Sequence, residues 1–194
     1  MPFAPKGRRV ITKAVAAGPL IGILSIGTGA AEAGGTRDCP GASAPARAQS
    51  RTTAASSVRC LVNVTRARSG ARPLRPSRLL DLAASRHTWA MVRTGVISHR
   101  APGEAPLRAR VSATGYFKRG RGAGAAEVVS WIGGGQATPQ GLVTRLLSSP
   151  AHRAILLNRR FRDIGAGLVW TAGPATGPGA GATILTVNLG TASR

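Results

Sequence analysis

Residues 148–170 restrict what this chain can fold into more than any other stretch, because a short capped helix leads there directly into a close-packed strand. Ser149 precedes Pro150, and a serine followed by proline at the first helical position marks the start of a helix. His152 falls in the first turn of that helix, where a neutral imidazole is favoured over a charged one. Small and apolar residues then alternate over Asp163–Trp170, which is typical of a β-strand packed closely against another element. The stretch therefore predicts a histidine presented by a rigid helix beside a core strand.

Amphipathic patterns along the rest of the chain indicate an α+β fold. Helical patterns with capping residues cover 57–69, 77–94, 105–114 and 139–157. Apolar strand candidates cover 126–132, 163–171 and 182–189, and the last two are expected to pair as a hairpin. We therefore predict an α-β-α sandwich in which a small antiparallel sheet is covered by helices.

Residues 1–33 have the pattern of a signal peptide. The basic residues of this segment are Lys6, Arg8, Arg9 and Lys13. An apolar run over 14–31 follows, and Ala31-Glu32-Ala33 places small residues around a cleavage site. The paired arginines also resemble a twin-arginine signal, so the sequence leaves the export route, Sec or twin-arginine, open. No later apolar segment is long enough to span a membrane, and we expect a secreted, extracellular protein without a transmembrane anchor.

The next segment combines small polar residues with one of the two cysteines. Residues 34–56 are rich in Arg, Ala and Ser without an apolar period, which predicts a flexible arm before a folded domain at 57–194. Cys39 lies in this arm and Cys60 opens the domain. Two cysteines in an exported chain most simply form a disulfide, and closing this loop would stabilise the domain by about 3 kcal/mol in the chain-entropy model.

The chain is strongly basic, with 27 Lys and Arg against 6 Asp and Glu. Without residues 1–33 it would carry a net charge of +18. Such an excess attracts polyanions, here an anionic cell-wall polymer or an anionic lipid. The alternative is that the arginines follow genomic base composition and only solvate the surface of a monomer. No basic strand with interleaved aromatic residues and no recognition helix accompanies the charge, so no specific nucleic-acid site is expected.

Two motifs resemble those of bacterial secreted proteins of the CAP superfamily, which takes in the cysteine-rich secretory, antigen 5 and pathogenesis-related proteins. Ser149-Pro150-x-His152-Arg153-x-x-x-Leu157, followed by Phe161-x-x-Ile164-Gly165-x-Gly167, is similar to the family's Ser-Pro-x-His-Arg motif and the strand after it. Ser98-His99 with Pro102 is similar to the family's Phe-Ser-His-x-x-Pro. The resemblance runs from about Cys60 to Gly190 and implies the CAP (SCP-like) fold.

The resemblance also implies a cleft with a tetrad of two histidines and two acidic residues. His99 and His152 match the histidines, which in the family can hold zinc, so both are candidate metal ligands. Glu127 matches one acid, although Ala126 and Val128 replace the glycine and asparagine that usually flank it. No second acid is identified, because serines occupy the region where eukaryotic relatives carry it. His87 lies within an apolar helical stripe and is expected to be a packed, hydrogen-bonded core histidine.

Two interpretations of His99, Glu127 and His152 stay open. They form either a hydrogen-bonded network that holds helices against the sheet, or a weak divalent-metal site, for which zinc is the natural ion. The function we expect is binding at the cell surface or wall, with an anionic polymer or a lipidic molecule as ligand. The alternative is a zinc-dependent peptidase or esterase outside the cell, with Glu127 as base. An enzyme is the less favoured class, because the sequence contains no His-Glu-x-x-His helix and no serine or cysteine with an evident base partner.

Overall fold

The computed structural model describes residues 39–119, 123–172 and 181–191 of the chain. The predicted signal peptide, residues 1–33, lies outside the described residues. The helices are α1 (Arg51–Arg68), α2 (Arg78–Thr94), α3 (Leu107–Ser112), α4 (Pro139–Ser148) and α5 (Pro150–Leu157). The strands are β1 (Arg75–Pro76), β2 (Ala125–Gly133), β3 (Asp163–Thr171) and β4 (Ala182–Gly190). None of the helices in these ranges is long and apolar enough to cross a membrane.

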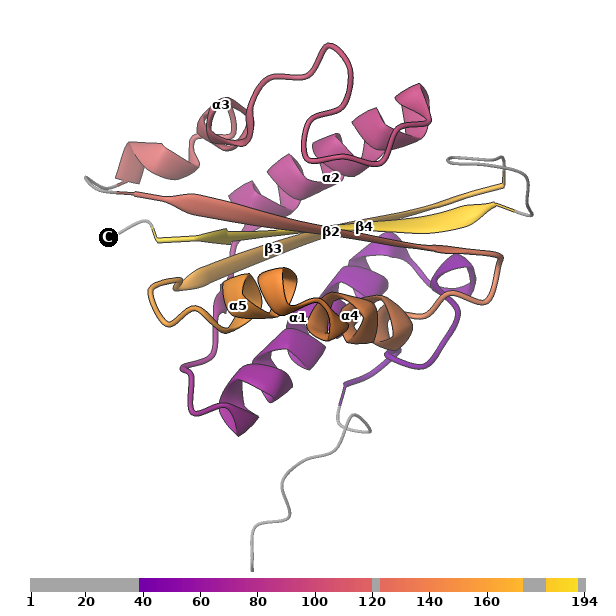
Figure 1. The fold of residues 1–194 in the computed structure, drawn as a ribbon, viewed down its shortest axis with the longest axis horizontal. Coiled ribbons are helices and arrows are strands. Elements are labelled where there is room, and N and C mark those ends of the chain that lie inside the picture. The colour runs from indigo at the N-terminus through magenta and orange to yellow at the C-terminus, as the bar shows by residue number, and fades with distance from the viewer. Residues whose placement is uncertain (1–38, 120–122, 173–180, 192–194) are drawn as a thin grey trace, which may run out of the picture. The chain divides into compact units, whose positions relative to one another are not determined.

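The strands form one sheet in the order β1-β3-β4-β2, with helices on both faces. α2 and α3 cover one face, and α1, α4 and α5 cover the other (Figure 1). The long strands β2, β4 and β3 are antiparallel neighbours, as predicted. The α+β sandwich is thereby confirmed. The sheet is mixed rather than purely antiparallel, because the two-residue strand β1 pairs in parallel with β3.

Two predicted helix boundaries were wrong. α1 begins at Arg51 rather than at residue 57, because the Ser50 side chain accepts a hydrogen bond from the backbone N–H of Thr53 and caps the helix there. The last part of the segment predicted to be a flexible arm is therefore helical. The helix expected over 139–157 is two helices, since Ser149 is extended (φ −90°, ψ 118°), the conformation that a following proline imposes.

The predicted disulfide between Cys39 and Cys60 is present. Cys39 is buried, and the bond ties the segment before α1 to the middle of that helix. Because the sequence separation is 21 residues, the cross-link removes chain entropy from the unfolded state worth about 3 kcal/mol.

β3 lies unusually close to α2, and this contact places the helix that carries His87. A Cβ atom added at Gly165 would overlap the backbone of Leu80 and Asp81, and one added at Gly167 would lie 2.5 Å from the backbone nitrogen of Ser85. The Asp81 carboxylate accepts a hydrogen bond from the backbone N–H of Ala166 (2.8 Å). The alternation of small residues in β3 therefore serves helix–sheet contact.

Candidate functional site

His87 lies on the sheet-facing side of α2 and is fully buried. Its Nδ1 is 2.6 Å from Oε2 of Glu104, and its Nε2 is 3.0 Å from the carbonyl oxygen of Ser98. The same Nε2 is 3.4 Å from Oε1 of Glu127. The prediction of a packed, hydrogen-bonded core histidine is confirmed, and the ring links two carboxylates.

Glu127 extends from β2 towards the α2 face of the sheet and is held by Arg110 of α3. Arg110 donates from Nη1 to Oε2 (2.9 Å) and from Nη2 to Oε1 (3.2 Å) of this carboxylate. Its Nη2 also donates to the carbonyl oxygen of His99 (2.9 Å). The side chains of Arg110 and Glu127 are only 7% and 2% exposed, so this is a buried, two-pronged ion pair.

Glu104 is a second acid beside His87, one that the sequence motifs did not identify, and together with Arg110 and Glu127 these residues form the cluster. Its Oε2 accepts from the backbone N–H of Ala101 (3.2 Å) besides facing His87, and its Oε1 lies 3.6 Å from Nε of Arg110. Glu104 follows His99 by five residues, in a turn closed by a hydrogen bond from its own N–H to the carbonyl oxygen of Ala101. That short spacing was the available signal.

His99 and His152 reach the cluster from opposite sides of the sheet. Nδ1 of His99, on the segment between α2 and α3, is 3.2 Å from Oε1 of Glu127, and 61% of the side chain is exposed. His152, in the first turn of α5, is half-buried, and its ring centroid lies 6.4 Å from that of His99. Burial, and secondly the charge of His99, lower the pKa of His152. The ring of His152 is therefore neutral at pH 7 and able to accept a hydrogen bond or a metal ion.

The side chains of the candidate site do not fit a zinc centre with three protein ligands. Among the described residues there is no group of three or more His, Cys, Asp or Glu side chains placed to hold a metal ion. Both oxygens of Glu127 already bond Arg110. Two imidazoles on one tetrahedral zinc have centroids about 5 Å apart, so His99 and His152, at 6.4 Å, would have to approach each other slightly to share an ion.

An apolar groove adjoins the cluster on the α2 side. It lies between α2 and the segment 102–113, with a volume of about 780 Å³. Leu82 and Trp89, two of the exposed large apolar residues of the described chain, line it together with Arg86. The groove meets the cluster only at Glu104 and Arg110, whereas His99, Glu127 and His152 do not line it.

Comparison with known proteins matches residues 60–175 to the CAP model, described as the cysteine-rich secretory protein family. No curated protein sequence matches the chain significantly. An extracellular protein containing an SCP domain from Bacillus anthracis has a similar structure, with a TM-score of 0.56 and 21% identity over 72% of this chain and 40% of that one. A Borrelia burgdorferi outer surface protein aligns with a TM-score of 0.57 and 16% identity, over 70% of this chain and 90% of that one.

A cysteine-rich secretory protein from Staphylococcus aureus is similar as well, with a TM-score of 0.52 and 18% identity over 73% of this chain. The present chain spans only 39% of the Staphylococcus protein, as it spans 40% of the Bacillus one. At these identities the likeness concerns the fold. The likeness does not extend to the activities of the complete relatives.

Proposed function

The chain belongs to the cysteine-rich secretory protein (CAP) family, and from this premise we propose that it acts outside the cell as a binding protein for an anionic polymer of the cell surface or wall. The location is part of the proposal. It is supported by the family to which the chain belongs and by the similar structures, which include an extracellular protein and an outer surface protein.

One cluster of arginines carries this proposal. We call it the arginine end; it consists of Arg66, Arg72, Arg75, Arg159, Arg160 and Arg162. Arg66 is buried between α1 and the end of α5, and its Nη1 donates to the carbonyl oxygens of Leu156 (2.6 Å) and Asn158 (3.1 Å). The other five are exposed around it.

Among the described residues, little neutralises the charge at the arginine end. Burial, and secondly the positive charge of Arg162, lower the pKa of Arg66. The acid at this end is Asp163, which is buried and already bonds Arg75 (3.0 Å) and the Tyr116 hydroxyl (2.7 Å). Burial is the larger cause, but the smaller contribution of Arg162 indicates repulsion between guanidinium groups, which a bound polyanion would relieve.

Binding should depend steeply on salt and on the arginine end in particular. The probe is a poly(glycerol phosphate) chain, titrated calorimetrically against the protein from low to physiological salt. We expect Arg159→Ala/Arg160→Ala to weaken binding several-fold. Each lost contact should lower the slope of log K against log salt by about 0.7–0.9, as in counterion release from nucleic acids.

The matched control is Arg86→Ala/Arg93→Ala, which removes the same charge from exposed positions on α2. It should leave both affinity and slope close to wild type. Equal losses in the two double variants would mean that net charge alone binds the polymer. Tighter binding to anionic lipid vesicles than to the polymer, in the same titration, would contradict the polymer and indicate a membrane surface as the ligand.

The hydrolase alternative has less support. A general base must be free to take a proton from water or substrate. Glu127 is 2% exposed and holds hydrogen bonds from Arg110 at both oxygens, and Glu104 faces the ring of His87. These contacts favour the interpretation of the acids as a network that holds α2, α3 and β2 together.

Weak divalent-ion binding by His99 and His152 is a second, smaller proposal. The observation behind it is the pair of imidazoles 6.4 Å apart, one of them with a lowered pKa. A lowered pKa means that His152 stays neutral to a lower pH than an ordinary histidine. Zinc binding should therefore persist at pH 7 and fade below about pH 6, where protons compete for the rings.

Calorimetric zinc titration tests this pair. Wild type should bind weakly at pH 7, and His99→Ala and His152→Ala should each reduce the affinity by about tenfold or more, the loss that even outer-shell changes cause. Magnesium, which prefers oxygen ligands, serves as the control ion and should not bind. Equal zinc affinity in all three proteins would contradict the metal site and leave the hydrogen-bonded network as the interpretation of these residues.

A further inference from the structure

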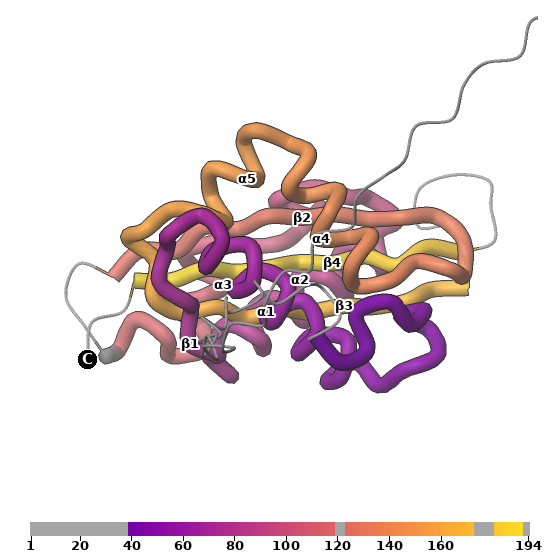
Figure 2. The backbone as a smooth tube through the Cα atoms, turned by 90° about the horizontal axis from the view of Figure 1, so that it is seen from below, coloured from indigo at the N-terminus to yellow at the C-terminus, as the bar shows by residue number. Residues whose placement is uncertain are grey.

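β2 is the outermost strand of the sheet on the side away from β1. Only β4 pairs with it among the described residues. Figure 2 shows α5 projecting past β2, on the side away from β4 and β3. His99 and His152 therefore approach each other around this edge, near Glu127.

Two hydrogen bonds identify which backbone groups of β2 point outwards. Gly134 donates to the carbonyl oxygen of Gly181 (2.9 Å), and Thr191 donates to that of Gly124 (3.0 Å). Both pairs continue the register in which Ala125 faces Gly190. Because hydrogen-bonded residues alternate in an antiparallel ladder, the even-numbered residues of β2 bond β4. The outward N–H and C=O groups belong to Ala125, Glu127, Val129, Trp131 and Gly133.

This edge lacks several of the features that usually prevent pairing. Natural sheet edges are kept short, or carry lysine, proline or a bulge. β2 has nine residues, and neither a basic residue nor a proline interrupts them. Its one charged side chain, Glu127, points inwards, which is itself a protection, but Arg110 pairs with the carboxylate and offsets its charge. In the described part of the chain, no hydrogen bond reaches the outward backbone groups.

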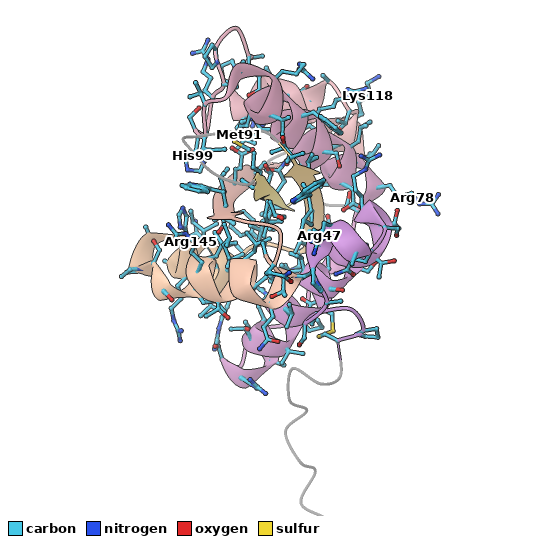
Figure 3. The ribbon with its side chains drawn as sticks, turned by 90° about the vertical axis from the view of Figure 1, so that its right-hand side faces the viewer. Arg47, Arg78, Met91, His99, Lys118 and Arg145 are labelled. Carbon is cyan, nitrogen blue, oxygen red and sulfur yellow. A yellow bond between two sulfur atoms is a disulfide. The ribbon has the colours of Figure 1, made fainter. Side chains whose placement is uncertain are left out.

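The charges beside this edge indicate which kind of partner could pair with β2. Arg145 of α4 and Arg153 of α5 are exposed on helices that contact β2, and Arg100 is exposed next to His99. Figure 3 shows His99 and Arg145 on the same side of the molecule. The acids of the described chain are Asp81, Glu104, Glu127 and Asp163, and each already faces a basic partner. A net charge of +21 disfavours a second copy of the chain.

We propose that the free edge of β2 binds an extended acidic peptide as an added strand. Main-chain hydrogen bonds to the outward groups would supply the affinity, and the flanking arginines would select acidic side chains. This surface lies at the opposite edge of the sheet from β1 and the arginine end, so it is independent of polymer binding.

Amide exchange read residue by residue tests the added strand. The probe is a ten-residue peptide of alternating Glu and Val, added to the ¹⁵N-labelled protein. Exchange at the outward amides of Glu127, Val129 and Trp131 should slow at least tenfold, whereas Val128 and Ser130, already bonded to β4, should change little. Adhesion by charge alone would slow exchange without this odd–even pattern and would overturn the proposal.

Two controls separate pairing from charge and from misfolding. The same peptide methylated at its four central amide nitrogens keeps its charge but loses donors, and it should bind at least tenfold more weakly. Val129→Pro removes an outward donor without removing a bond to β4, so it should fold and lose the peptide. Arg159→Ala/Arg160→Ala should bind the peptide normally, which distinguishes failure here from failure of the polymer proposal. Equal binding of the methylated peptide, or odd-residue protection that grows with protein concentration alone, would refute it.

Discussion

Replacement of Arg110 by alanine is expected to lower the free energy of unfolding by about 3–5 kcal/mol, the cost of removing one partner of a buried ion pair. Glu127, which is 2% exposed in the wild type, would lose hydrogen bonds at both carboxylate oxygens. The carbonyl oxygen of His99 would lose its donor as well. Denaturant unfolding of wild type and variant measures the difference.

Arg108→Ala is the control for the Arg110 variant, because Arg108 lies on the same helix but is exposed. It should cost no more than about 1 kcal/mol, the range of an exposed cation–π contact such as the one it makes with Phe117. The double variant Arg110→Ala/Glu127→Gln should be less destabilised than the sum of its single changes, because no unpaired charge remains. Strict additivity would show that the two side chains do not act as a pair.

Gly165→Ala should also destabilise the protein severely, by about 3 kcal/mol or more, through overpacking between β3 and α2. The added methyl group would overlap the backbone of Leu80 and Asp81, and a helix backbone has no rotamer with which to move aside. α2 would have to shift as a whole, carrying His87 with it. Thermal and denaturant unfolding report the loss.

Gly133→Ala is the matched control, at the end of β2. A Cβ atom there would meet nothing closer than the Trp131 ring at 3.7 Å, an ordinary contact. It should change the unfolding free energy by less than about 0.5 kcal/mol, as surface substitutions usually do. A stable Gly165→Ala protein with an unchanged melting temperature would show that α2 can move away from β3 without cost.

Local patterns determined most of the secondary structure from the sequence alone. Helical periodicity placed α2 almost to the residue, since Ser77 caps its start and Gly95 adopts φ +67° at its end. The two cysteines could pair only with each other within the chain. The motif around Ser149 and the small residues of β3 likewise located His152 and the close-packed strand.

Most of the structural features that the sequence did not predict depend on residues far apart in the chain, which local patterns do not indicate. β1 is two residues long and exists only because β3 lies beside it. The early start of α1 is an exception, because Ser50 caps the helix locally although residues 51–56 show no apolar period.

The cluster around His87 shows the same division. His99, Glu127 and His152 could be named from short motifs, because each follows a local signal. Glu104 and Arg110 acquire their roles only when α3 and the turn before it pack against β2, so that Arg110 meets Glu127 and Glu104 meets His87. Which backbone groups of β2 face outwards was likewise decided by its register with β4, because an antiparallel ladder uses alternate residues and a slip of one would exchange them.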